Sequence, residues 1–213
     1  MEEMFFKELL KDKILAAVTL ESSQDALFVA EALLKGGLNV MEVPLRTKDA
    51  FKAITLIKKE FPEMKIGAGT ILRKEQIAAL VDIGVDFGLS AGFNENLVEE
   101  IAKSKLPYIP GVFSPSEIER AYEFGFKVQK VFPIGQLGGT KYLKAISGPY
   151  GHLGLKFIPM GGVNQENFTD YIKIGNVIAA GGSWMVNKEL IRNKEFKAIE
   201  DGVRALINIS HAR

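Results

Sequence analysis

Residues 127–133 read KVQKVFP, a short apolar segment that ends at Pro133. Apolar segments of this length, bounded by glycine or proline, are typical of β-strands. Side chains alternate along a strand, so Val128, Lys130 and Phe132 share one face of it. The same kind of segment recurs along the chain, separated each time by an amphipathic stretch of about ten to fifteen residues. This alternation predicts βα units around a parallel sheet.

Eight segments have this strand character. They are residues 14–20, 39–45, 65–70, 87–91, 108–113, 127–133, 156–161 and 177–181. Residues 23–35 and 94–103, between them, show the apolar spacing of helices. Eight strand–helix units predict an α/β fold of the (β/α)₈ TIM barrel type, with an extra N-terminal helix over residues 1–11 that closes the bottom of the barrel. No linker or repeat interrupts the pattern, so we expect residues 1–213 to form a single barrel domain.

The composition limits the kinds of partner that this chain has. With 213 residues, of which 47% are hydrophobic and 25% charged, the chain is long enough to bury one large core. The 27 basic and 26 acidic residues give a formal charge of +1 without a basic block, so nucleic acid is not expected as a partner. The start, MEEMFFK, is acidic and lacks a long apolar stretch, so we expect neither a signal peptide nor a membrane partner.

Cysteine is absent, and histidine is found only at His152 and His211. The absence of cysteine excludes disulfides, thiolate zinc sites and cysteine nucleophiles, and it agrees with a cytoplasmic location. Two histidines that are distant in the chain make a histidine-ligated metal site difficult to assemble. We therefore expect no metal in the function.

Lys130 carries a charge in the middle of an apolar strand segment, where a charged side chain is unusual. If its strand face is buried, the ammonium loses hydration, which favours the neutral and nucleophilic amine. The structural alternative is a lysine whose aliphatic stem packs while its head reaches water at the strand end. The strand by itself favours that alternative, because structural lysines are the commoner kind.

The second strand segment carries a carboxylate and then an arginine. Glu42 shares a strand face with Val40 and Pro44, where an apolar side chain is usual. A buried carboxylate suits a general base, and a structural ion pair across the barrel is the equal alternative. Arg46 follows the strand, and its planar set of donors suits a substrate carboxylate or a carboxylate of a nearby helix.

Small residues end three further strand segments. The third segment ends GAGT, which brings the Thr70 hydroxyl to the mouth of the barrel. The seventh and eighth segments end in Gly161-Gly162 and in Gly181-Gly182-Ser183, at the two turns where TIM barrels commonly hold a phosphate on backbone N–H groups. Turn geometry explains either glycine pair equally well, but the two pairs together favour an anion.

Together these residues predict carbon–carbon bond cleavage of a 2-oxo acid. A desolvated Lys130 forms a Schiff base with the ketone, and Glu42 moves protons. Arg46 and Thr70 hold the adjacent carboxylate, while the glycine turns bind a terminal phosphate. The iminium withdraws electrons from the breaking bond, a task that a metal performs in other aldolases.

Five motifs, in this order and spacing, resemble those of the KDPG/KHG aldolase family. They are EVPLRT at residues 42–47, GAGT at 67–70, KVFP at 130–133, PMGG at 159–162 and GGSW at 181–184. The family comprises class I aldolases acting on 2-dehydro-3-deoxy-6-phosphogluconate (KDPG) and 4-hydroxy-2-oxoglutarate (KHG). The resemblance runs from about Lys13 to beyond Trp184. It implies a TIM barrel, usually a homotrimer, that releases pyruvate and an aldehyde, glyceraldehyde 3-phosphate in the best-known case, with a covalent Schiff base and no other cofactor.

The resemblance also implies roles for single residues. Lys130 would be the Schiff-base lysine and Glu42 the general acid/base. The substrate-binding residues would be Arg46 and Thr70 at the carboxylate, Phe132 beside the imine, and Gly161, Gly162, Gly182 and Ser183 at the phosphate end. The chain departs from the family pattern at Ala91, Met160 and residues 134–137. These departures bear on the substrate: KDPG, its galactonate epimer, KHG or an unphosphorylated analogue.

Two other classes of function use the same barrel. Phosphosugar isomerases, epimerases and thiamin phosphate synthase-like enzymes also have glycine turns after strands seven and eight. They need no lysine inside the sixth strand. A non-catalytic barrel that binds a sugar acid would instead keep Lys130 and Glu42 as a neutralised ion pair without an open pocket above it.

Overall fold

The computed structural model describes residues 2–212, and it has an α/β architecture with curled parallel sheets. The strands are β1 Ile14–Ala17, β2 Val40–Pro44, β3 Lys65–Gly69, β4 Phe87–Leu89, β5 Tyr108–Ile109, β6 Gly111–Val112, β7 Val128–Val131, β8 Lys156–Pro159 and β9 Ala180–Gly182. The α-helices are α1 Glu2–Leu9, α2 Asp25–Gly36, α3 Ala50–Glu60, α4 Lys74–Ile83, α5 Glu95–Ser104, α6 Pro115–Glu123, α7 Gly139–Tyr150, α8 Phe168–Ile172, α9 Lys188–Arg192 and α10 Phe196–His211. A short 3₁₀ helix, η1, covers Gly151–Leu153. Met1, the first residue of the predicted N-terminal helix, lies outside the described residues.

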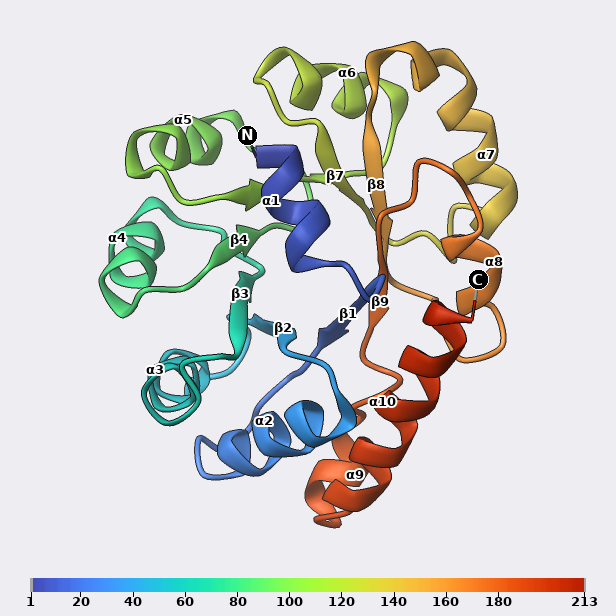
Figure 1. The fold of residues 1–213 in the computed structure, drawn as a ribbon. Helices are drawn as coiled ribbons and strands as arrows, with labels where there is room; N and C mark the ends of the chain where they lie inside the picture. Colours follow the sequence, from blue (N-terminus) through green and yellow to red (C-terminus); the bar gives the residue numbers. More distant parts are fainter. Residues whose placement is uncertain (1, 213) are drawn as a thin grey trace.

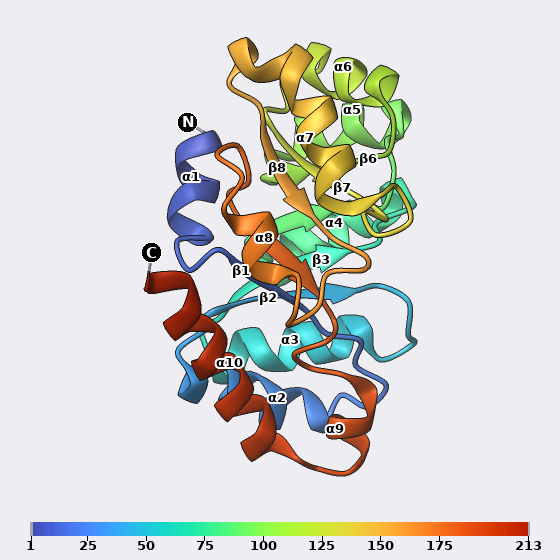
Figure 2. The ribbon, with the colours of Figure 1, turned by 90° about the vertical axis from the view of Figure 1, so that its right-hand side faces the viewer.

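The strands pair in two parallel sheets. One sheet has the order β5-β4-β3-β2-β1-β9, and the other has the order β6-β7-β8. The helices lie outside the curled strands, and α1 lies across the end from which the strands start (Figures 1 and 2). The predicted helix over the bottom of the sheet is therefore present in the described residues, and the C-terminal strand ends meet at the opposite end.

The strand pattern differs from the prediction at two places. The predicted fifth strand is interrupted at Pro110, which has no N–H for a ladder hydrogen bond, and its halves β5 and β6 belong to different sheets. The predicted eighth strand begins at Val177, but β9 begins at Ala180. Isolated parallel bridges, Phe157 with Val177 and Met160 with Gly181, link the β8 segment to the β9 segment.

Side-chain hydrogen bonds cap the first turns of α5 and α6. Asn94 accepts a hydrogen bond from the Leu97 N–H, and Ser114 accepts one from the Glu117 N–H. The Glu117 carboxylate accepts a bond from the Ser114 N–H in return, which forms a capping box. These caps fix where the chain turns from strand ends into α5 and α6.

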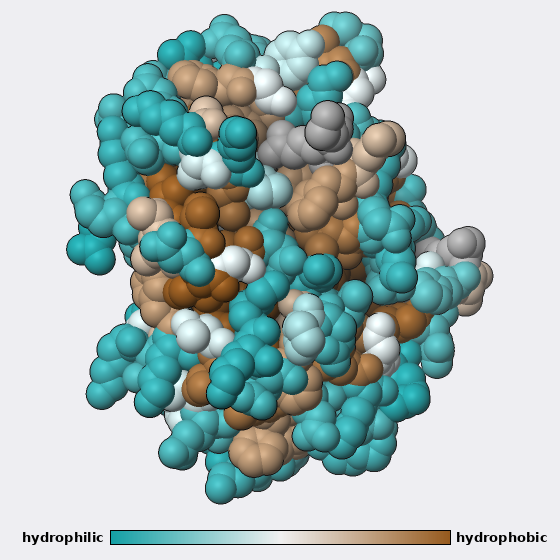
Figure 3. Space-filling model, turned by 60° about the vertical axis from the view of Figure 1, so that its left-hand side comes forward, coloured by the Kyte–Doolittle hydropathy of each residue, from teal (hydrophilic) through white to brown (hydrophobic). Residues whose placement is uncertain are grey.

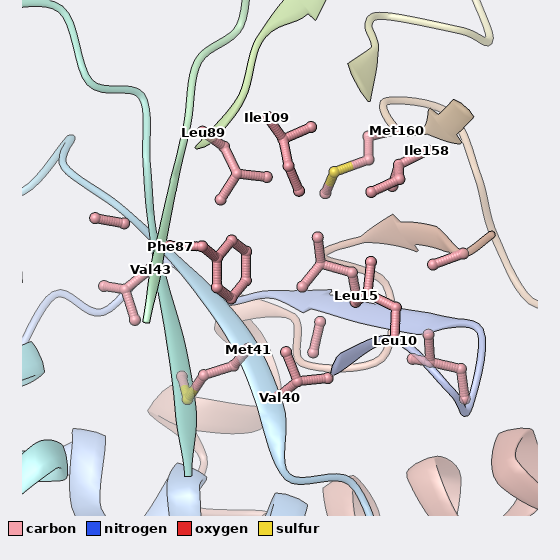
Figure 4. Close-up of a cluster of buried hydrophobic side chains, with 14 of the residues drawn as sticks. Leu10, Leu15, Val40, Met41, Val43, Phe87, Leu89, Ile109, Ile158 and Met160 are labelled. Atoms are coloured by element: carbon pink, nitrogen blue, oxygen red, sulfur yellow. The ribbon is translucent and has the colours of Figure 1, made fainter. Parts of the chain in front are cut away.

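The space between the strands is filled by apolar side chains from both sheets. Figure 4 shows Leu15, Phe87, Leu89, Ile109 and Ile158 converging on one region, and each of them is buried. Burying a side chain of this size typically contributes about 1.5–3 kcal/mol. The interior is thus a packed core, and a charged group within it needs a specific reason.

The surface carries apolar side chains in recesses between hydrophilic helix faces (Figure 3). A groove of about 510 Å³ is lined by Phe5, Ile101, Ala102, Lys105, Leu106, Pro107, Phe124 and Phe126. Most of these residues precede strands or belong to α1, so the groove lies at the end where the strands start. No helix within residues 2–212 is long and apolar enough to cross a membrane.

Candidate active site

Lys130 and Glu42 are in contact inside the curled sheets. Lys130 lies on β7 and Glu42 on β2, 88 residues apart in the chain. The Lys130 Nζ donates to Glu42 Oε1 at 3.1 Å, and it lies 3.5 Å from Oε2. Lys130 is 5% exposed and Glu42 is 1% exposed. The two charges therefore meet in a region from which water is nearly excluded.

Strand register explains why both side chains point inward. Lys130 is the register partner of Gly111 on β6 and of Ile158 on β8, and Ile158 is a core residue. Glu42 is the partner of Ala17 on β1 and of Gly67 on β3. Partners in a ladder share a sheet face. Register therefore turns both side chains toward the interior, where they meet.

Phe132 lies between the Lys130 amine and the turn after β8. The Lys130 Nζ is 5.4 Å from the centroid of the Phe132 ring, within cation–π distance. The ring also packs against Gly161, where an added Cβ would lie 2.8 Å from ring carbon Cε2. Gly161 also has a φ of 79°, which favours glycine. Gly161 is thus required both by the turn and by the aromatic ring.

Arg46 and Thr70 stand at the C-terminal ends of adjacent strands. Leu45 donates its N–H to the Gly69 carbonyl at 2.8 Å, so the chain after β2 stays beside the end of β3. Arg46 is exposed, and among residues 2–212 it has no carboxylate partner. Thr70 has a φ of 56°, a strained backbone conformation for a β-branched residue. Strain of this kind is common where a side chain must be held for function.

The glycine turns after β8 and β9 lie beside each other through the Met160–Gly181 bridge. Within the described part of the chain, the N–H groups of Gly161, Gly162 and Ser183 have no acceptor. The turn after β8 is fixed by Asn167, whose Nδ2 donates to the Gly162 carbonyl at 3.0 Å. Unpaired N–H groups on a fixed turn have the chemistry of an anion site.

One residue of this region, Thr19, was not singled out from the sequence. Thr19, after β1, accepts a hydrogen bond from Arg46 Nη2 at 2.9 Å. The residue type gives no signal, because single threonines are common after strands. Its position at a strand end of a predicted barrel is the only clue in the sequence. Met160 is 2% exposed and points into the interior near Ile109 and Leu89 (Figure 4).

A buried lysine beside a carboxylate, with an arginine and unpaired N–H groups beyond the strand ends, is the arrangement that a Schiff-base lyase needs. The family model for KDPG and KHG aldolases matches residues 6–201. The chain therefore belongs to the KDPG and KHG aldolase family, whose members act through a Schiff base.

Proteins of this family resemble the chain over nearly its whole length. It is 40% identical over 194 residues to a 2-dehydro-3-deoxy-phosphogluconate aldolase of Treponema pallidum, covering 91% of each protein. It is 37% identical over 207 residues to the enzyme of that name from Haemophilus influenzae, covering 97% of each. A crystal structure of KDPG aldolase from Legionella pneumophila, with pyruvate captured as a covalent carbinolamine, has a TM-score of 0.90 and 37% identity, and the match covers 94% of this chain and 97% of that one.

Proposed function

We propose that this chain cleaves KDPG to pyruvate and glyceraldehyde 3-phosphate, with Lys130 as the Schiff-base lysine and Glu42 as the general acid/base. The 3.1 Å contact between Lys130 Nζ and Glu42 Oε1 supports the proposal, and the family match over residues 6–201 favours it over a purely structural ion pair, which would show the same contact. With the shared proton on nitrogen the two groups are an ion pair. With it on oxygen they are a neutral amine and a carboxylic acid, the state that attacks a ketone.

The reaction then follows from this pair. Neutral Lys130 attacks the C2 carbonyl to give a carbinolamine, and the Glu42 acid protonates the departing hydroxyl, so that water leaves and an iminium forms. The Glu42 carboxylate, directly or through a water, takes the proton of the C4 hydroxyl as the C3–C4 bond breaks and the aldehyde departs. The bonding electrons pass into the iminium to give an enamine. Protonation at C3 and addition of water then release pyruvate and the free amine.

Binding of the two substrate ends is assigned to opposite parts of the site. Arg46 and Thr70 would hold the carboxylate next to C2, since Arg46 carries a charge without a carboxylate partner among residues 2–212. Phe132 would pack beside the imine, because its ring already lies 5.4 Å from the Lys130 amine.

The phosphate end is assigned to Gly161, Gly162, Gly182 and Ser183. The unpaired N–H groups of Gly161, Gly162 and Ser183 support this assignment. Backbone N–H groups favour a phosphate through hydrogen bonds and through their aligned dipoles.

Three further properties belong to the proposal. The two sheets would complete one eight-stranded barrel in a single domain, which the bridges from Phe157 to Val177 and from Met160 to Gly181 support. A homotrimer and a cytoplasmic location are inferred from the family likeness and from the lack of cysteine. Light scattering on the purified protein tests the assembly, with a mass of about three times 23.4 kDa expected and the mass of one chain contradicting it.

A panel of 2-oxo-3-deoxy acids tests the substrate. Pyruvate release would be followed for KDPG, its galactonate epimer, KHG and the unphosphorylated form of KDPG. We expect the highest kcat/KM for KDPG and a value lower by about a hundredfold or more for the unphosphorylated acid, because each lost hydrogen bond to a charged group removes about 1.5–3 kcal/mol. Equal kcat/KM values for the phosphorylated and unphosphorylated acids would contradict the assignment of a phosphate site to the glycine turns.

A further inference from the structure

We propose that Thr19 is a positioning residue, which holds the Arg46 guanidinium in the orientation that receives the substrate carboxylate. This inference rests on the proposed function, because it concerns how Arg46 binds that carboxylate. The bond from Arg46 Nη2 to Thr19 Oγ1, at 2.9 Å, is the side-chain hydrogen bond that Arg46 makes within residues 2–212.

A neutral acceptor suits this task better than a carboxylate would. Arg46 is exposed at the end of a long flexible side chain, so without a partner its guanidinium would sample many orientations. Aspartate or glutamate at position 19 would fix it too, but would neutralise the charge that the substrate needs. The Thr19 hydroxyl takes up one of five N–H donors and leaves the charge and the other donors for the ligand.

Thr19 itself is held firmly relative to Glu42. The Val18 N–H, one residue earlier, donates to the Glu42 carbonyl at 2.8 Å. One residue later, the Leu20 carbonyl accepts a hydrogen bond from Thr47 Oγ1 at 2.6 Å. Thr19 is therefore fixed on both sides to the β2 segment and the turn after it, and it lies two residues beyond Ala17, the register partner of Glu42. This places the arginine at a set height above the Lys130–Glu42 pair.

Thr19→Val tests the inference, because valine keeps the shape of threonine and removes the hydroxyl. The readout is the pyruvate concentration that gives half-maximal inactivation by borohydride, together with kcat and KM for KDPG. We expect the pyruvate concentration and the KM to rise about fivefold to tenfold, the scale of one hydrogen bond, while kcat changes less than about twofold. Thr19→Ser restores the hydroxyl and should give wild-type values.

Two comparisons separate positioning from a general effect on the loop. Thr47→Val removes one of the two bonds that fix the segment around Thr19 but keeps the Thr19 hydroxyl, so it should raise the KM less than Thr19→Val does. In an Arg46→Met background, Thr19→Val should have no further effect, because the residue on which Thr19 acts is gone. An unchanged KM in Thr19→Val, an equal rise in Thr47→Val, or a full effect without Arg46 would each overturn the inference.

The outcome for Lys130 distinguishes this inference from the proposed function. If pyruvate and borohydride label Lys130 in the wild type and Thr19→Val has no effect, only the positioning role fails. If the wild type takes no label, the proposed function fails first, and the role of Thr19 falls with it.

Discussion

Gly69 leaves the space that the Glu42 carboxylate occupies, since a Cβ on residue 69 would overlap Glu42 Oε1. The two residues lie on neighbouring strands, with Gly69 two positions beyond the register partner of Glu42. Glu42 can therefore reach Lys130 only while position 69 lacks a side chain.

Gly69→Ala should displace Glu42 and slow the reaction. We expect kcat for pyruvate release to fall about a hundredfold or more, the usual contribution of a positioned acid/base. Stability should also fall, by about 1–3 kcal/mol, because the added methyl overpacks the site. Gly202→Ala is the matched control, since a Cβ there meets nothing within 4 Å. A wild-type kcat in Gly69→Ala would contradict the role of this space.

Removal of one member of the buried pair should cost more stability than removal of both charges. In Lys130→Met the Glu42 carboxylate loses its cation at a site where it is 1% exposed, which should lower the free energy of unfolding by about 3–5 kcal/mol. Lys130→Met combined with Glu42→Gln has no buried charge and should regain most of that loss. Urea unfolding at pH 8 measures both. An equal loss in the two variants would show that the pair is not coupled.

Replacement of Thr70 by glycine should stabilise the fold and weaken substrate binding. Its φ of 56° is strained for threonine, so Thr70→Gly should raise the free energy of unfolding by about 1 kcal/mol. The same change removes the hydroxyl and should raise the KM for KDPG. Urea unfolding and steady-state kinetics on one preparation test the two effects together. A destabilised variant would mean that Thr70 packing outweighs its backbone strain.

Alkaline pH should weaken the fold through Tyr108. Burial raises the pKa of Tyr108 from 10.0 to about 12, and a side-chain hydrogen bond with Ser90 lowers it by a smaller amount. The folded chain thus keeps the phenol proton that the unfolded chain releases, and this contribution to stability is full below pH 10 and is lost as pH rises toward 12.

Tyr108→Phe removes that titration. Between pH 9 and pH 11 the wild type should lose about 1 kcal/mol more of its free energy of unfolding than the variant, because one pKa unit corresponds to about 1.4 kcal/mol. Tyr122→Phe, at an exposed tyrosine, serves as the control and should follow the wild type. If Tyr108→Phe follows it as well, the phenol does not cause the alkaline loss.

Much of the architecture follows from local patterns. Apolar strand segments with glycine or proline boundaries place β1 to β4 within a few residues, and the caps at Asn94 and Ser114 fix the starts of α5 and α6. The break at Pro110 follows from chemistry visible in the sequence, but which halves pair with which sheet depends on tertiary contacts. Residues 177–181 are apolar like a strand, yet only their last two residues belong to β9, because ladder pairing depends on neighbours distant in the chain.

Some features of the site can likewise be predicted from the sequence, while others depend on tertiary contacts. Lys130 and Glu42 stand out in the sequence because each is a charge on an apolar strand face, and the barrel pattern predicts that both point inward. Their 3.1 Å contact depends on register across several strands, which local sequence does not encode. The bond from Arg46 to Thr19 joins a residue of the EVPLRT motif to a segment that carries no motif of its own.

Borohydride trapping with pyruvate tests the central claim most directly. The protein is incubated with pyruvate, reduced, digested and examined by peptide mass spectrometry. The account predicts one adduct, on the peptide that contains Lys130, and its loss in Lys130→Met. An adduct on a different lysine, or none while pyruvate is still released from KDPG, would contradict it.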